Sequence, residues 1–330
     1  MAHGDRPIDT LGFPVRQDAA AFPAPVVDAG PGVLGELGAA SEATTRKPAS
    51  LWRDAWRRLV RNRLALIGLT LVTLFILVAA FAPLLAPYGE SEVVDVRLAR
   101  HAPNWIWPFG LDANARDIFS RMMYGARVSL LVGVVAYLII LSIAIPVGSI
   151  AGYYGGRVDN VLMRLVDVIF TIPQVLLVLM FVNWRGPGLL NIFLAIGLIG
   201  WVTEARLIRG QFLTLREQDY VKASKVAGAS GPYIILRHLL PNSLTPIIVA
   251  VTFGIPTAIF TEAAISFVGV GIRPPQASWG QMVGAASNPG DIQTNPHMLV
   301  FPVLAIGLTM LGFTFLGDGL RDALDPKGND

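Results

Sequence analysis

Six stretches of about 20 mostly apolar residues restrict the fold of this 330-residue chain more than any other feature. A helix needs about that many residues to cross the hydrocarbon core of a bilayer. In that core the backbone polar groups must bond one another, so each stretch predicts a helix rather than a loop. The expected spans are 64–86, 128–153, 161–182, 186–203, 241–270 and 298–317.

The composition agrees with an all-α membrane protein. Hydrophobic residues make up 53% of the chain and charged residues only 15%, against about 25% in a typical soluble domain. The chain has no cysteine, which excludes disulfides and thiolate metal sites. Its four histidines are scattered, so we expect no metal site and no cofactor.

Basic residues gather on segments that we expect to face the cytoplasm. Residues 49–63 combine apolar residues at helical spacing with five arginines, which is typical of an amphipathic helix lying in the membrane interface. Lys-rich and Arg-rich segments stay on the cytoplasmic side. Six spans then place both termini in the cytoplasm, which predicts a multi-pass protein of the plasma (inner) membrane.

The remaining segments divide the chain further. Residues 1–48, with six prolines and six glycines, predict a disordered cytoplasmic tail. Residues 87–127 are expected as an external loop, although their five arginines are unusual outside. The other five spans form a core over 128–322, and 323–330 is a short C-terminal tail. The loop 271–297 has one arginine and is also expected outside.

The long insert between the fourth and fifth spans, residues 204–241, is the most patterned polar segment. Asp219 is a suitable N-cap for a short helix, and Gly228 suits the left-handed position that ends one. Pro241 is expected to stop a second short helix where the fifth span begins. An ordinary connection in a helical bundle has 2 to 8 residues, so a plain surface loop explains this insert poorly.

The insert resembles the EAA loop of permease subunits from ATP-binding-cassette (ABC) importers. Lys222, Ala223 and Ser224 occupy the triplet, Gly228 the glycine, and Leu240 with Pro241 the end of the motif. Lys222 replaces a glutamate and His238 an isoleucine. Segments 109–133, 262–282 and 317–326 also resemble the dipeptide, oligopeptide and nickel permease branch of this family, in the expected order.

The resemblance implies a type I ABC importer permease fold, with the short helix acting as a cytoplasmic coupling helix. It implies four kinds of partner: a second homologous permease subunit forming a heterodimer, two ATP-binding subunits, an external substrate-binding protein and the lipid bilayer, but no nucleic acid. Members of the branch carry di- or oligopeptides, nickel complexes and some sugars. The chain has no GxxxxGK[ST] motif, so we expect no ATPase activity of its own and no catalytic residue.

Several residues leave alternatives open. Glu262 lies inside a span, where an ionisable side chain suggests function, but it is near the outer end and could cap or pair there. Arg164 and Asp167 are spaced to form a local pair, and Trp279 is expected as an interfacial anchor. A secondary transporter driven by an ion gradient is the alternative function. It would leave the patterned insert unexplained.

Overall fold

The computed structural model describes residues 51–324, and these residues form helices and connecting loops without a β-strand. The predicted tail 1–48 and all but two residues of the tail 323–330 lie outside this range. The elements are α2 (Leu51–Arg61), α3 (Arg63–Leu85), η1 (Val96–Leu98), α4 (Ile118–Tyr154), α5 (Gly156–Thr171), α6 (Gln174–Arg185), α7 (Leu189–Leu215), α8 (Asp219–Val226), α9 (Gly231–Ile234), the π-helical turn η2 (Ile235–Leu239), α10 (Leu240–Asn242), α11 (Leu244–Phe267), α12 (Trp279–Ala285), α13 (Pro289–Thr294) and α14 (His297–Leu324).

Five of these helices are long and apolar enough to cross a bilayer: α3, α4, α7, α11 and α14. A sixth span exists if α5 and α6 are taken together. The all-α membrane architecture predicted from hydropathy is confirmed, and so is a helix at the position of the predicted amphipathic segment.

The third span, expected over 161–182, is broken into two helices. Helices α5 and α6 meet at an angle of 81°. The break lies at Ile172–Pro173, where Ile172 has an extended backbone (φ −90°, ψ 129°). The proline ring disfavours a helical conformation in the residue before it, so the helix ends there. By contrast, α4 and α11 contain Pro146 and Pro256 and continue past them.

The second span begins earlier than predicted. Helix α4 starts at Ile118, so the loop expected over 87–127 ends at residue 117. The cap is Asp117, whose carboxylate accepts hydrogen bonds from the Ser120 backbone N–H (2.8 Å) and hydroxyl (2.6 Å). The charged residues near this boundary concealed the start of the helix.

The fourth span continues past Thr203, where the insert was expected to begin. Helix α7 runs to Leu215 and carries charged residues that pair with α5. Arg206 binds Asp167 at 2.7 Å, and Arg209 binds Asp159 through Nη2 at 2.6 Å. The predicted pairing of Asp167 with Arg164 is therefore wrong, because Asp167 is bound by a residue from another helix.

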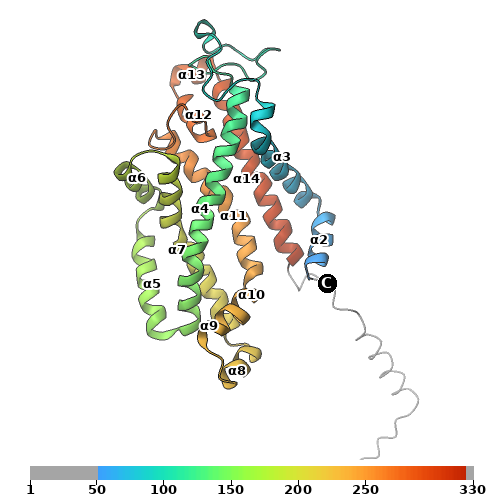
Figure 1. Ribbon diagram of the computed structural model, residues 1–330, viewed down its shortest axis with the longest axis vertical. Coiled ribbons are helices and arrows are strands. Elements are labelled where there is room, and N and C mark those ends of the chain that lie inside the picture. Colours follow the sequence, from blue (N-terminus) through green and yellow to red (C-terminus); the bar gives the residue numbers. More distant parts are fainter. Residues whose placement is uncertain (1–50, 325–330) are drawn as a thin grey trace, which may run out of the picture. The chain divides into compact units, whose positions relative to one another are not determined.

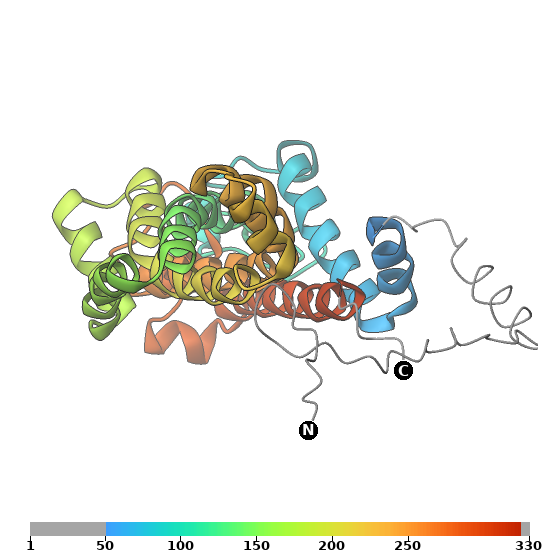
Figure 2. The ribbon, with the colours of Figure 1, turned by 90° about the horizontal axis from the view of Figure 1, so that it is seen from below.

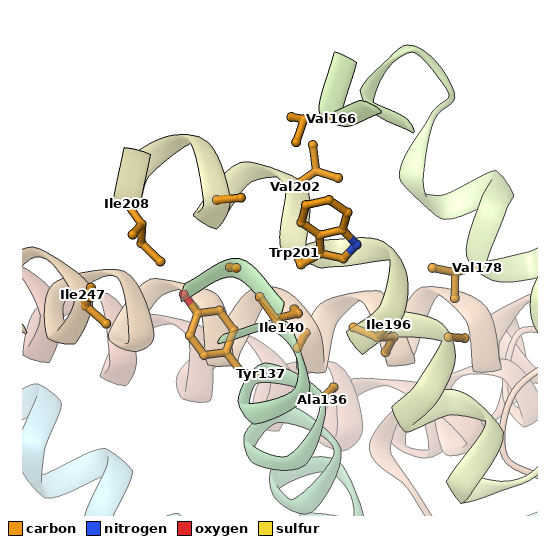
Figure 3. Close-up of a cluster of buried hydrophobic side chains, with 14 of the residues drawn as sticks. Ala136, Tyr137, Ile140, Val166, Val178, Ile196, Trp201, Val202, Ile208 and Ile247 are labelled. Atoms are coloured by element: carbon orange, nitrogen blue, oxygen red, sulfur yellow. The ribbon is translucent and has the colours of Figure 1, made fainter. Parts of the chain in front are cut away.

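The helices are arranged around α4 and α7 (Figure 1). Helices α2 and α3 lie on one side of the bundle and α5 and α6 on the other, also when it is viewed from the α8 end (Figure 2). Helices α8, α9 and α10 lie at one end, and α12 and α13 at the opposite end. A buried apolar cluster joins α4 to α7 and includes Trp201, Val166, Val178 and Ile247 from α7, α5, α6 and α11 (Figure 3).

Helices α4 and α7 approach each other most closely at glycines. A Cβ atom at Gly148 of α4 would lie 2.6 Å from the Ala205 carbonyl oxygen and 2.8 Å from Cβ of Ile208, both on α7. Small residues are common where membrane helices pack backbone to backbone, because dispersion contacts supply much of the attraction there. The α4–α7 contact therefore tolerates no side chain at residue 148 without displacement of α7.

We predict that Gly148→Ala destabilises the protein while Gly210→Ala does not. Both glycines are helical, so the gain in helix propensity is the same, but a Cβ at Gly210 meets no atom within 4 Å. Overpacking at Gly148 costs about 2 kcal/mol. Thermal unfolding in detergent measures the difference, and equal midpoints for the two variants would contradict the packing described here.

Candidate coupling element and membrane cavity

One side chain of the short helix α8 is buried in the bundle. Val221 is 0% exposed and belongs to the same buried cluster as Phe212 of α7 and Ile234 of α9. The neighbouring Lys222 and Ala223 are exposed. Helix α8 is therefore a surface element with a single buried anchor.

The end of α8 has the geometry predicted for it. Gly228 has φ +82°, the left-handed conformation that glycine adopts without a steric penalty. Its N–H donates to the Lys225 carbonyl (3.0 Å), and the Ala229 N–H donates to the Ser224 carbonyl (3.0 Å). These two bonds form a Schellman motif. At the start of α8, Asp219 is the first helical residue and Gln218 the N-cap, which corrects the predicted cap by one residue.

The residues predicted to form the coupling motif lie in two neighbouring segments. Nζ of Lys222 lies 3.9 Å from Oε2 of Glu217. The Ser224 hydroxyl lies 3.3 Å from Nε2 of His238, which belongs to the following π-helical turn. Leu240 and Pro241 begin α10, and the backbone stays helical up to residue 242. The prediction that Pro241 stops the helix is therefore wrong. Proline is tolerated in a first helical turn, since the N–H it lacks would have no partner there.

Apolar side chains are exposed around α8. Val226, on its last turn, is 90% exposed, and Tyr220 is also exposed. Tyr233 of α9 and Leu236 of the π-helical turn are exposed as well. No other segment of the described residues covers Val226, so this end of the bundle presents an apolar surface of the kind that marks a protein contact.

Glu262 is the centre of a hydrogen-bond network at the opposite end of α11. Its side chain is 0% exposed, and its carboxylate accepts bonds from the hydroxyls of Ser266 (2.7 Å), Ser278 (2.8 Å) and Ser129 (3.4 Å). These serines belong to α11, to the N-cap of α12 and to α4. From sequence, Glu262 could be a functional group or a residue that caps or pairs near the outer end of its span. The three hydrogen bonds agree with the second role.

Trp279 is buried beside this network rather than anchored at the membrane interface. It is 1% exposed, its backbone N–H donates to the Ser129 hydroxyl (3.2 Å), and its indole N–H donates to the Met122 carbonyl (3.1 Å). The expectation of an interfacial anchor is wrong, because α12 folds inward against α4. A sequence position near a span boundary does not reveal such a re-entry.

Ion pairs and hydrogen bonds join the loops at this end. Arg121, buried on α4, donates to the Gln281 side chain (2.9 Å) and to the Glu90 carbonyl (3.0 Å). Arg100 binds Asp291 at 2.6 Å. The Arg100 hydrogen bond lowers the pKa of Asp291, and the same bond raises the pKa of Arg100. These contacts join residues far apart in sequence, so no local pattern predicted them.

A cavity of about 880 Å³ lies between α4, α7 and α11. It reaches the end of the bundle at which α14 ends, through Arg321 and Leu324. In the described part of the chain, no cluster of three or more His, Asp or Glu side chains could hold a metal ion. The cavity is lined by Tyr137, Ile140, Gln174, Ile196, Gly200, Thr203, Glu204, Leu207, Gln211, Thr245, Pro246, Val249, Ala250, Phe253, Gly254, Thr257, Ala258, Thr261, Arg321 and Leu324.

The chain matches known families over most of its length. Residues 144–329, more than half of the chain, match the family described as the binding-protein-dependent transport system inner membrane component. The chain belongs to this family. Residues 50–103 match the N-terminal TM domain of oligopeptide transport permease C.

Three relatives illustrate the family. The dipeptide transport system permease protein DppC of Bacillus subtilis is 42% identical, covering 87% of this chain and 89% of the relative. The oligopeptide permease protein OppC of the same organism is 42% identical, covering 87% and 93%. The glutathione transport system permease protein GsiD of Shigella dysenteriae is 42% identical, covering 84% and 90%.

The family establishes the general function. The chain is a multi-pass inner-membrane permease subunit of an ABC importer, a class in which the ATPase is a separate subunit. The predicted permease fold is confirmed, and the importer is favoured over a transporter driven by an ion gradient.

We predict that Glu262→Ala destabilises the bundle, whereas Glu217→Ala leaves its stability unchanged. The first change leaves three buried hydroxyls without their shared acceptor, at a cost of about 3 kcal/mol. Glu217 is exposed and bonds only Arg216 and Lys222 among the described residues. Unfolding in detergent provides the comparison, and a Glu262→Ala variant as stable as the parent would contradict a structural role for the network.

Proposed function

We propose that this chain is one of two homologous permease subunits that form the membrane pathway of an importer for di- or oligopeptides. The names of the relatives support this substrate class, since they carry dipeptides, oligopeptides and glutathione. The complete complex contains a heterodimer of permeases, two ATP-binding subunits and an external binding protein that delivers the substrate. In this assembly the chain provides half of the path and hydrolyses no ATP.

Helix α8 is the coupling helix of this proposal. The observation that carries it is that α8 has one buried anchor, Val221, and an exposed apolar residue, Val226, at its end. An ATP-binding subunit would cover this surface and bury the exposed apolar area, which favours association. Lys222, Ala223 and Ser224 form the contacting turn, and Gly228 ends it.

Leu240 and Pro241 connect the region of α8 to the membrane helix α11. They form the start of α10, which joins the π-helical turn to α11. The C-terminal end of α7 precedes α8, so a displacement of α8 is passed to two helices that both line the cavity. A small movement at the cytoplasmic face is thereby converted into a rearrangement of the pathway.

Both termini lie in the cytoplasm in this proposal. Helix α2 carries arginines and packs against the last turns of α14, and the positive-inside rule assigns this end of the bundle to the cytoplasm. The loops around α12 and α13 then face outward, where the binding protein docks. The 86–117 loop lies on that side despite its basic residues.

We predict that Val226→Asp uncouples the importer while Val93→Asp does not. A charge at position 226 must be desolvated in the contact with the ATP-binding subunit, whereas Val93 is as apolar and also exposed, at 47% against 90% for Val226, but lies in the opposite loop. Co-purification with the ATP-binding subunits and binding-protein-stimulated ATPase activity should fall at least tenfold for Val226→Asp. Normal co-purification and normal ATPase activity of Val226→Asp would contradict the proposed role of α8.

We predict that Ser91→Cys and Ser230→Cys label from opposite sides of the membrane. The chain has no cysteine, so each variant carries one thiol, and both serines are exposed. In intact spheroplasts a membrane-impermeant maleimide should label Ser91→Cys at once. Ser230→Cys should react only after permeabilisation, and the reverse result would overturn the orientation.

A further inference from the structure

The cavity is elongated and nearly uncharged. Its lining on α11 extends from Thr245 to Thr261, which corresponds to about 24 Å of helix at 1.5 Å per residue. Its volume of about 880 Å³ is within the range of sites that bind small organic molecules. Among the lining residues only Glu204 and Arg321 carry a full charge.

Glu204 lies on the face of α7 that lines the cavity. Thr203, Leu207 and Gln211 line the same cavity, and Leu207 and Gln211 follow Glu204 at helical spacing of three and seven residues. The nearby arginines of α7 are already bound, since Arg206 pairs with Asp167 and Arg209 with Asp159.

No ion pair joins Glu204 to any cation in residues 51–324. Arg321 is on the last turn of α14, at the end of the cavity near which α7 ends, and is exposed. The carboxylate of Glu204 therefore has no basic partner within the described chain. An ionisable side chain in a membrane-spanning helix is costly and marks a functional site when it faces a cavity.

Tyr137 of α4 is the second polar group at this site. Its side chain is 3% exposed, and its hydroxyl has no hydrogen-bond partner of normal length among the described residues. The ring is seated against Gly254 of α11, where any Cβ would overlap it. The hydroxyl is turned toward the side of Ile208 and Ile247 (Figure 3), and the carboxylate of Glu204 interacts with it both electrostatically and as a long, weak hydrogen-bond acceptor.

Glu204 has no basic partner among the described residues, and its interaction with Tyr137 leaves the negative charge uncompensated. Leaving a buried hydroxyl without a good hydrogen bond is unfavourable, and a ligand that accepts or donates there removes this cost. A carboxylate in surroundings of low dielectric constant attracts a cation more strongly than one in water. A cationic group with hydrogen-bond capacity satisfies both side chains at once.

We propose that Glu204 and Tyr137 bind the positively charged amino group of the substrate as it passes through the cavity. Glu204 supplies the compensating charge, and Tyr137 supplies a hydroxyl that hydrogen-bonds the substrate. This assignment rests on the proposed peptide-import function, because the free amino end of a peptide is largely an ammonium at neutral pH. The ligand class is therefore a small peptide with a free amino terminus.

The test compares trialanine with N-acetyl-trialanine, which lacks the ammonium group. Binding of each peptide is measured by calorimetry on the complete importer in nanodiscs without the binding protein, and import is measured in proteoliposomes with it. The variants are Glu204→Gln and Tyr137→Phe. Glu92→Gln is the matched control, because it makes the same chemical change at an exposed residue outside the cavity.

We expect Glu204→Gln to weaken trialanine binding at least tenfold and to leave the weak binding of N-acetyl-trialanine unchanged. Tyr137→Phe should weaken trialanine binding about threefold, and Glu92→Gln should match the parent. An equal effect of Glu204→Gln on both peptides, or none on either, would overturn the site. So would a loss of the second permease subunit from the purified complex, since Glu204 would then lie at a subunit contact.

The same experiment separates this site from the proposed function. If the parent complex imports neither peptide with ATP and the binding protein present, the peptide-import proposal fails and the peptide assignment of the site fails with it. If the parent imports trialanine and Glu204→Gln imports it with the same KM, only the site is wrong.

Discussion

The close packing of α4 against α7 is the contact on which the other functional parts depend. Gly148 lets the two backbones meet, and Arg216 Nη1 donates to the Gly152 carbonyl at 3.1 Å, where α7 ends. That second contact fixes the point from which α8 begins. Residues of the same two helices also line the cavity, so one packing arrangement positions the coupling element and the pathway together.

Helix α11 connects two regions of different character. At one end Glu262 joins three elements through serine hydroxyls in a buried network. At the other end α11 follows the π-helical turn and α10, which lie beside α8. The cavity extends between these ends. One end of the bundle is held by buried hydrogen bonds, and the other end is exposed. Such a bundle is suited to movement at the exposed end, where the ATP-binding subunit is proposed to dock.

Strong local signals made part of this structure predictable. Length and hydropathy located most of the spans, and Gly228 predicted the end of α8 because few other residues adopt φ +82° without strain. Pro173 has a local signal as well, but its effect differed from that of Pro146 and Pro256. Proline removes one helical bond in each case, and the surrounding packing decides whether the helix breaks or continues.

The remaining features depended on contacts between distant segments. The extension of α7 beyond Thr203 is stabilised by ion pairs with Asp159 and Asp167 on α5. In the sequence alone, the charged residues of this extension look like those of a polar loop. The burial of Trp279 follows from the inward fold of α12. Glu204 drew no attention in the sequence, since it was assigned to a polar insert and its cavity is formed by residues from five helices.

In the proposed mechanism α8 moves with the ATPase cycle while the opposite end of the bundle stays in place. Spin labels at Val226→Cys and Ser91→Cys in the complete importer report this movement by double electron–electron resonance. Adding ATP to a complex with hydrolysis-deficient ATP-binding subunits should shift the distance distribution between the two labels. A distribution that stays the same with and without ATP would contradict the account.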